Sequence, residues 1–316
     1  MKNIKNYFDR NQQVYFNHRY GTHNYRNRRK LLVGWLLGPV TVAGLLLLFT
    51  GLIMPLIKNL KSPPVSLNSQ PVVAGTIAKN EPKKIKQLNP DNTELESVIK
   101  SEMRQFPATG QWSVYVYDLK DDSIVDINAG QTHDAASLYK LFMLARLEEK
   151  LPYDQWSSTW LVDQNVYDCV YNMLRQDDDP CGEDLAEYLD PDSVDKYNQK
   201  NGYKNTRLSG NAGKQTTARE VGRLIVDLKN GQMLSDNARR FIFDALYSQQ
   251  LEKGIQPGCG DCRTANKPAQ LSGAAYDAGV ITHGQRSYVL VIMSQGGNFK
   301  QISQLTKLVD NYLIKN

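Results

Sequence analysis

Ser137 and Lys140 are the two residues of this 316-residue chain whose types and spacing best fit covalent chemistry. They stand three positions apart at the start of an apolar run, so on a helix they share one face, one turn from each other. A serine hydroxyl becomes a useful nucleophile when a base takes its proton, and a lysine whose pKa is lowered by burial or nearby cations can do so. Backbone N–H groups at the start of the same helix would stabilise an oxyanion. Because Ser-x-x-Lys is common by chance, the context decides whether this pair is a nucleophile and its base.

The elements that must position this pair are a mixture of strands and helices. Alternating patterns predict a strand hairpin over 111–118 and 123–127, and two further strands over 275–282 and 287–295. Residue spacing predicts helices over about 95–106, 137–149 and 163–175, from Thr217 to Gly231, and at the C-terminus. Thr217 and Glu220 have the spacing of a capping box. Strands at both ends of residues 91–316 with helices between them favour one antiparallel sheet with helices on its faces.

Four stretches of the chain resemble, in this order, the class A β-lactamase-like serine hydrolases and the related penicillin-recognising peptidases: VYVYDLKDDSIVDINAGQTHDAASLYKLFML, TTAREVGRLIVDL, GQMLSDNARRFIFDAL and TANKPAQLSGAAYDAGVIT. The resemblance covers most of residues 94–316. It implies an α/β (α+β) domain with a five-stranded, mainly antiparallel sheet flanked by helices. By the same resemblance Ser137 is the acylated nucleophile, Lys140 is its base or proton relay, and Lys267 binds the substrate carboxylate. The backbone N–H groups of Ser137 and Gln270 would form the oxyanion hole.

Two family motifs are altered in this chain. Where the family has Ser-Asp-Asn, residues 177–179 read Asp-Asp-Asp, and where it has Lys-Thr-Gly, residues 267–269 read Lys-Pro-Ala. Asp177 thus replaces a relay hydroxyl, Asp179 replaces an amide that holds substrate, and Pro268 lacks the hydroxyl that contacts the substrate carboxylate. Asp177 is either a substitute base near the nucleophile or a solvated carboxylate that caps a helix, and the sequence leaves both interpretations open.

A third departure concerns hydrolysis of the acyl-enzyme. Class A β-lactamases activate the attacking water with a glutamate shortly before the Thr-Thr helix start, but residues 196–219 contain no Asp or Glu. Loss of a general base removes a factor of about 10²–10⁴ from such a step. We therefore expect slow turnover, transfer to another acceptor or a long-lived acyl-enzyme rather than fast antibiotic hydrolysis.

The positive charge of the chain is concentrated outside the predicted domain. Residues 1–30 carry eight basic and one acidic side chain, and residues 58–90 carry six and one, so residues 91–316 have a net charge of −7 although the whole chain has +5. An acidic domain repels a phosphate backbone, so no nucleic-acid partner is expected.

Residues 31–57 contain 27 consecutive positions without a charge. A helix of this length would be about 40 Å long and exceeds the roughly 30 Å hydrocarbon core of a bilayer. The basic arm 1–30 favours a cytoplasmic N-terminus and an extracytoplasmic C-terminal domain. We expect an uncleaved single-pass membrane anchor, with a cleaved signal peptide as the alternative, followed by a Pro- and Lys-rich linker over 58–90 and the hydrolase domain over 91–316.

The four cysteines of the chain all follow the predicted anchor, in a compartment where disulfides persist. The simplest pairing joins Cys169 to Cys181 and Cys259 to Cys262, and a four-thiolate zinc site is the alternative. The four histidines have no metal-ligand spacing, and His133 is expected on a surface loop. We expect no metal and no other cofactor.

The sequence as a whole favours a β-lactamase-like serine hydrolase that acts through a Ser137 acyl-enzyme on β-lactams or D-Ala-D-Ala-type cell-wall peptides. The outer domain is expected to be monomeric. One alternative is a catalytically inactive, membrane-anchored pseudoenzyme that binds peptidoglycan. Another is an ectodomain whose cytoplasmic arm carries the function.

Overall fold

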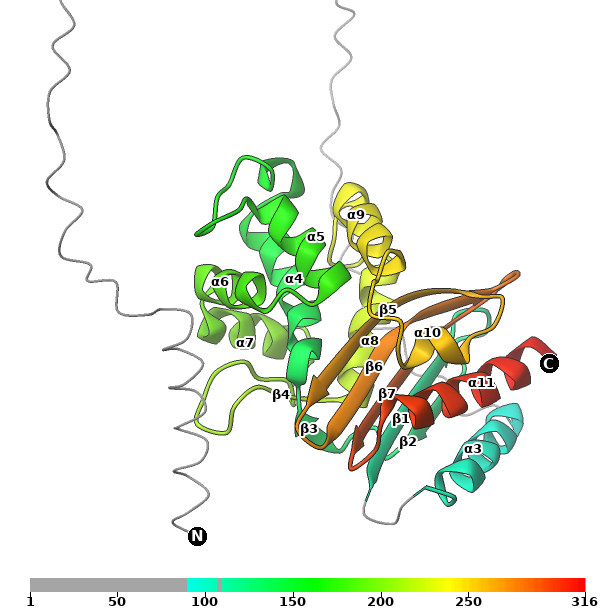
Figure 1. The fold of residues 1–316 in the computed structure, drawn as a ribbon. Coiled ribbons are helices and arrows are strands. Elements are labelled where there is room, and N and C mark those ends of the chain that lie inside the picture. The colour runs from blue at the N-terminus through cyan, green and yellow to red at the C-terminus, as the bar shows by residue number, and fades with distance from the viewer. Residues whose placement is uncertain (1–89, 107–109, 316) are drawn as a thin grey trace, which may run out of the picture. The chain divides into compact units, whose positions relative to one another are not determined.

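A five-stranded antiparallel sheet is the centre of the computed structural model, which describes residues 90–106 and 110–315 (Figure 1). The strand order is β2-β1-β7-β6-β5, and every neighbouring pair is antiparallel. The strands are β1 (Gln111–Asp118), β2 (Ile124–Ile127), β5 (Arg263–Leu271), β6 (Ala274–His283) and β7 (Arg286–Gln295). The predicted hairpin and the two predicted C-terminal strands are therefore correct, and they meet where β1 pairs with β7.

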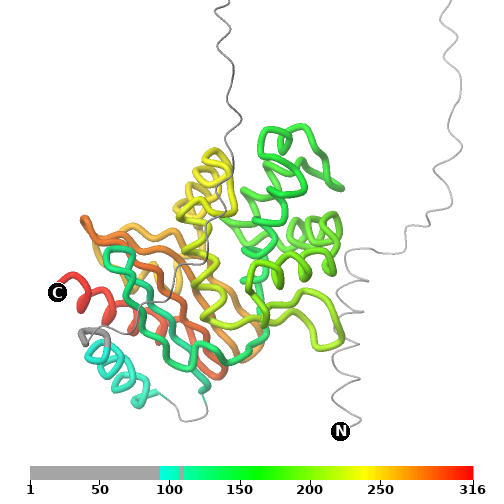
Figure 2. The backbone as a smooth tube through the Cα atoms, turned by 180° about the vertical axis from the view of Figure 1, so that it is seen from behind, coloured from blue at the N-terminus to red at the C-terminus, as the bar shows by residue number. Residues whose placement is uncertain are grey.

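Both faces of the sheet are covered, because successive residues of the central strands point to opposite sides. In β7, Leu290 and Ile292 belong to one hydrophobic core and Val289 and Val291 to the other. The first core lies under α3 (Pro90–Met103), α10 (Ile255–Gly258) and α11 (Phe299–Lys315). Helices α3 and α11 lie side by side although they come from opposite ends of the described chain (Figures 1 and 2).

The second core joins the other face of the sheet to a helical region. Its elements are η1 (Ala136–Leu138), α4 (Tyr139–Lys150), η2 (Tyr153–Gln155), α5 (Val166–Gln176), α6 (Asp179–Leu189), α7 (Pro191–Lys200), α8 (Ala218–Lys229) and α9 (Asp236–Tyr247). Helix α4 is buried almost all round, as its central place among these helices requires. A small second sheet pairs β3 (Thr132–Asp134) with β4 (Gln215–Thr217) beside the start of α4.

The predicted helix at 137–149 begins as a single 3-10 turn, η1, before α4 continues it. Only one of the two hydrogen bonds of the predicted capping box is present. The Thr217 hydroxyl accepts a hydrogen bond from the Glu220 N–H at 3.2 Å and so caps α8. The Glu220 carboxylate does not return to Thr217; it accepts hydrogen bonds from Asn205 and Thr206 instead.

Both predicted disulfides are present. Cys169 of α5 is bonded to Cys181 of α6 with a Cα separation of 5.3 Å, and Cys259 is bonded to Cys262 with a Cα separation of 5.7 Å. Since these bonds use all four thiols of the chain, no thiolate remains for the alternative zinc site. The first disulfide ties the end of α5 to the beginning of α6, which fixes the loop at residues 177 and 178.

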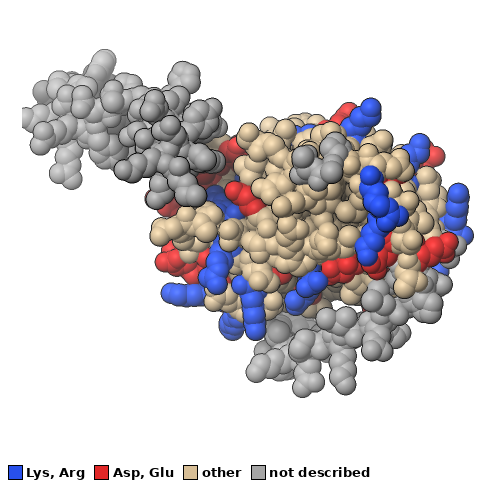
Figure 3. Space-filling model, turned by 90° about the horizontal axis from the view of Figure 1, so that it is seen from below, with Lys and Arg blue, Asp and Glu red and all other residues tan. Residues whose placement is uncertain are grey.

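The predicted basic arm, anchor and nearly all of the linker lie outside the described residues. Within residues 90–106 and 110–315, none of the helices combines the length and the hydrophobicity that a membrane span needs. On the face of the domain seen in Figure 3, lysine and arginine side chains are interspersed with aspartate and glutamate side chains. This mixture differs from the single-sign stripe typical of nucleic-acid-binding surfaces.

Candidate active site

Ser137 is presented by an abrupt change from strand to helix. Strand β3 ends at Asp134, the Ala135 N–H donates to the Lys214 carbonyl at 2.8 Å, and η1 begins one residue later. Ala136 adopts a left-handed φ of +43°, which costs an L-residue about 1–2 kcal/mol. The Ala136 N–H is held by the Asp134 carboxylate at 3.3 Å. This turn leaves Ser137 partly exposed while its neighbours on both sides are buried.

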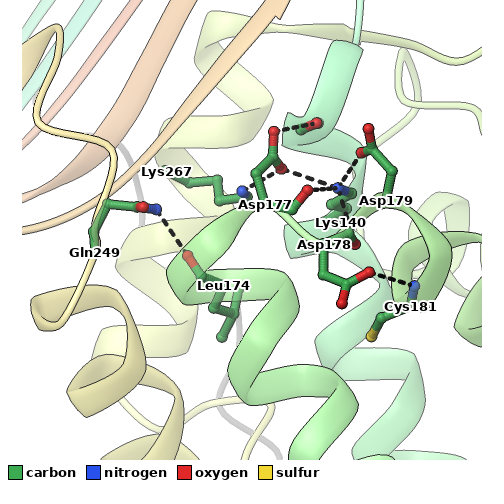
Figure 4. A network of polar contacts seen from close by, with 9 residues as sticks. Lys140, Leu174, Asp177, Asp178, Asp179, Cys181, Gln249 and Lys267 are labelled. Carbon is green, nitrogen blue, oxygen red and sulfur yellow. Dashed lines mark hydrogen bonds and ion pairs between the residues drawn. The ribbon is translucent and has the colours of Figure 1, made fainter. Parts of the chain in front are cut away.

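Lys140 lies one turn further along and is completely buried. Its Nζ donates to the carboxylates of Asp177 at 2.9 Å and Asp179 at 2.7 Å, and to the carbonyls of Asp177 and Asp178 at 3.4 Å each (Figure 4). Gly182 makes room for this side chain, since a methyl group there would lie 2.7 Å from Lys140 Cε. The predicted Ser-x-x-Lys pair is thus assembled, with the lysine directed at the three consecutive aspartates.

Asp177 connects the groups of the site. It ends α5 with a left-handed φ of 60°, and the Asp178 side chain then caps α6 by accepting from the Cys181 N–H at 3.1 Å. Asp177 Oδ2 accepts from the Ser137 hydroxyl at 3.1 Å, and Oδ1 accepts from the ammonium groups of Lys140 and Lys267. Burial alone would raise the pKa of Asp177, but Lys267 and Lys140 outweigh it and hold that pKa below its usual value.

Lys267 reaches the site from β5, an edge strand that lies against η1. Its side chain is completely buried and donates to Asp177. Burial lowers the pKa of Lys267 to about 8, with a further contribution from the Lys140 charge, although Asp177 opposes the shift. Pro268 follows without an N–H group, which an edge strand tolerates.

Five of the six predicted catalytic and substrate-binding residues therefore meet in one network: Ser137, Lys140, Asp177, Asp179 and Lys267. Figure 4 shows the four charged residues of this network. Gln270 lies three residues beyond Lys267 on β5, with an exposed side chain that accepts from Lys253 at 3.4 Å. Its role in an oxyanion hole concerns its backbone N–H and stays a prediction. The contact of Asp177 with the serine hydroxyl supports the interpretation that places this carboxylate near the nucleophile, rather than that of a solvated helix cap.

Lys214 is a residue near the site that the sequence analysis missed. It pairs with Ala135, two residues before the serine, and its Nζ lies 3.6 Å from the ring centroid of Tyr139. Burial lowers the pKa of Lys214, while the charge of Glu183 opposes that shift. No family motif or residue spacing in the sequence singles out this lysine.

The loop that contains Lys214 is held by two carboxylates that flank it in sequence. Asp195 accepts from the N–H groups of Leu208 at 2.6 Å and Ser209 at 3.1 Å. Glu220 accepts from the Asn205 N–H at 2.9 Å. Both carboxylates are buried and bind backbone, so they serve the shape of the loop rather than the serine.

The expectation of a surface loop around His133 is wrong. His133 lies on β3 with 3% exposure, its Nε2 is 2.8 Å from the Ser113 hydroxyl, and burial lowers its pKa. The pairing of β3 with β4 covers this residue, and two such short strands give little sequence pattern.

A sequence profile of the beta-lactamase enzyme family (Beta-lactamase2) matches residues 94–159 and 154–313. The chain belongs to this family. The resemblance stated from the sequence is thereby confirmed. No curated protein sequence matches this family member.

Solved structures agree with the family assignment at the level of the fold. The structure of PBP-A has a TM-score of 0.62 at 16% identity, covering 71% of this chain and 97% of PBP-A. A beta-lactamase from Desulfarculus baarsii gives 0.63 at 16% identity, with 71% and 99% covered. A beta lactamase from Xanthomonas campestris pv. campestris gives 0.64 at 12% identity, with 71% and 98% covered.

Proposed function

We propose that this protein is a serine hydrolase of the penicillin-recognising type, which forms an acyl-enzyme through Ser137 on β-lactams or on D-Ala-D-Ala-type cell-wall peptides. The observation that carries the proposal is the 3.1 Å hydrogen bond from the Ser137 hydroxyl to Asp177, in a network with two buried lysines. Among the similar structures, a PBP-A mutant was solved as an acyl-enzyme complex with penicillin G. That precedent supports a penicillin as the first substrate to try.

The other residues have the roles that surround an acylated serine. Lys267 provides a cation for the substrate carboxylate, and the N–H groups of Ser137 and Gln270 provide donors for the oxyanion. Asp179 provides a carboxylate at the position where the family holds substrate with an amide. Substrates whose amide or ammonium group can donate to this carboxylate are therefore favoured.

Deacylation is the slow step of the proposed reaction. Hydrolysis of the acyl-enzyme needs a base that activates water, and residues 196–219 contain no Asp or Glu. Asp195 and Glu220, which flank it, are engaged with loop groups. The acyl-enzyme is expected to persist long enough to be isolated.

Labelling with a fluorescent penicillin tests the proposal. The wild-type protein should give a covalent band on a denaturing gel, and Ser137→Ala should give none. Ser158→Ala, which removes an exposed hydroxyl from a loop outside the network, is the matched control and should label like the wild type. A band that survives in Ser137→Ala would contradict the proposal.

A second candidate function is a catalytically inactive module that binds peptidoglycan. It is favoured by the carboxylates of Asp177 and Asp179, which both hold the Nζ of Lys140 and leave it without a free lone pair for the serine. This candidate predicts no labelled band at high penicillin concentration together with retention on purified peptidoglycan.

We also propose that residues 31–57 anchor the protein in the membrane as a single pass, with residues 1–30 in the cytoplasm and a monomeric domain outside. The 27 uncharged positions support the span, and two disulfides support an oxidising compartment. A tag at the N-terminus should remain on the mature, membrane-bound protein and should be protected from protease in intact cells. Release of a tag-free domain into the medium would contradict the anchor.

A further inference from the structure

The contacts of Lys140 show that its Nζ atom acts as a hydrogen-bond donor. The Nζ atom faces four oxygen atoms, of Asp177, Asp178 and Asp179, at 2.7 to 3.4 Å. Carboxylate and carbonyl oxygens only accept hydrogen bonds, so Lys140 is the donor in each contact. An ammonium group satisfies this set, whereas a neutral amine that is to receive a proton would have to turn its lone pair toward one of these acceptors.

The contacts of the Ser137 hydroxyl lead to a different group. Its oxygen donates to Asp177 Oδ2 at 3.1 Å, within the reach expected of a general base. The two oxygens of Asp177 divide their contacts: Oδ1 accepts from the two lysine ammonium groups, and Oδ2 accepts from the serine. The lysines therefore fix the plane of the carboxylate and leave one oxygen directed at the nucleophile.

We propose that Asp177 is the general base that accepts the Ser137 proton during acylation, and that Lys140 and Lys267 stay protonated and position it. This inference rests on the proposed acyl-enzyme. The bond between Oγ and the substrate carbonyl carbon forms as the hydroxyl proton moves to Asp177 Oδ2. The carbon–nitrogen bond of the substrate amide then breaks, and the same proton passes from Oδ2 to the leaving nitrogen. Asp177 returns to its ionised form, so the step balances without another reactant.

The pH dependence of acylation separates this base from a lysine base. The charged groups that face Asp177 are Lys140 on α4, Lys267 on β5 and Asp179 on α6, with Lys214 near Lys140 and Asp179. An aspartate whose pKa lies below 3.8 is ionised throughout the range from pH 5 to pH 7, and Lys267, with a pKa of about 8, is mostly protonated there. A lysine base must first lose its proton, so its rate would rise about tenfold for each pH unit.

The test is the acylation rate constant of the full-length protein with a fluorescent penicillin, measured between pH 5 and pH 7. We expect the wild-type rate to change less than about threefold over this range, and Asp177→Asn to lower it by about 10²–10⁴-fold. Asp236→Asn is the matched control, because this exposed carboxylate at the start of α9 pairs with Arg239 outside the network, and it should leave the rate within about threefold of the wild type.

Two results would overturn the inference. One is a wild-type rate that climbs about tenfold per pH unit, which needs no variant and so does not depend on folding. The other is an Asp177→Asn protein that is acylated as fast as the wild type. With either result, label on Ser137 would still support the proposed function. Absence of any wild-type label would overturn the proposed function together with this inference.

Discussion

Two regions border the start of α4: the junction between α5 and α6, and the loop over residues 203–217. Carboxylates make different contacts in these two regions. At the junction, Asp177 and Asp179 point at the lysines of the site, and one of them contacts the nucleophile. At the loop, Asp195 and Glu220 are buried and bind backbone N–H groups. Under the proposed function, the junction provides charge for the attack by Ser137, whereas residues 196–219 provide no carboxylate for a water that would hydrolyse the product. A change at the junction should therefore alter the chemistry, and a change at the loop should alter stability alone.

The largest loss of stability is expected at the loop. Glu220→Ala removes the acceptor of the Asn205 and Thr206 donors inside the protein, which should lower the free energy of unfolding by about 4 kcal/mol. At temperatures where the variant is folded, the acylation rate should stay within about threefold of the wild type. Denaturant unfolding and penicillin labelling on the same preparation test both statements. A stably folded Glu220→Ala protein that is no longer labelled would contradict the distinction between the junction and the loop.

Removal of the junction disulfide should affect both properties. Cys169→Ala with Cys181→Ala opens a loop of sequence separation 12 and should cost about 3 kcal/mol. Labelling should also slow, since this bond fixes the ends of the two helices that carry Asp177 and Asp179. The matched control is Cys259→Ala with Cys262→Ala, a separation of 3, which should cost about 2 kcal/mol and leave labelling unchanged. Equal labelling of the two double variants would contradict the role given to the junction.

Gly182→Ala tests the packing of Lys140 directly. The added methyl group would lie 2.7 Å from Lys140 Cε, so the lysine must move away from its carboxylates. We expect a loss of about 2 kcal/mol in thermal or denaturant unfolding and a slower acylation. Gly210→Ala, a loop glycine with open space around it but a φ of +101°, controls for backbone strain without a contact to the site. Slow labelling of the Gly210→Ala variant would show that backbone strain away from the site, and not displacement of Lys140, slows acylation.

The smallest effect is a pH dependence of stability below pH 4. Because the folded pKa of Asp177 lies below its unfolded value of 3.8, its ionised form stabilises the fold above that value. This contribution is lost as the pH falls through the folded pKa. The unfolding free energy of wild type should therefore drop more steeply between pH 4 and pH 2 than that of Asp177→Asn. Parallel curves for the two proteins would show that the ion pairs of Asp177 contribute nothing to stability.

Much of the fold could be predicted because its signals are local. The alternating residues of β1 and β7 and the side-chain cap at Thr217 are properties of short segments, and the structure has them at nearly the predicted bounds. The pair Ser137 and Lys140 was found for the same reason, since one helical turn sets their distance.

The parts of the site that the sequence left open or did not indicate depend on long-range packing. Asp177 lies 40 residues from Ser137, and its left-handed backbone at the end of α5 directs it there. The spacing of the three aspartates predicts neither this left-handed turn nor the contact of Asp177 with Ser137. Lys214 meets Ala135 only through the pairing of β3 with β4, and the same pairing buries His133.

Mass spectrometry of the full-length protein after incubation with penicillin G tests the central claim most directly. The account predicts one adduct of the mass of the intact antibiotic per chain, carried by the peptide that contains Ser137, still present long after free penicillin is removed and absent from Ser137→Ala. An adduct on another residue, or hydrolysis of penicillin G at a rate that leaves no adduct, would contradict it.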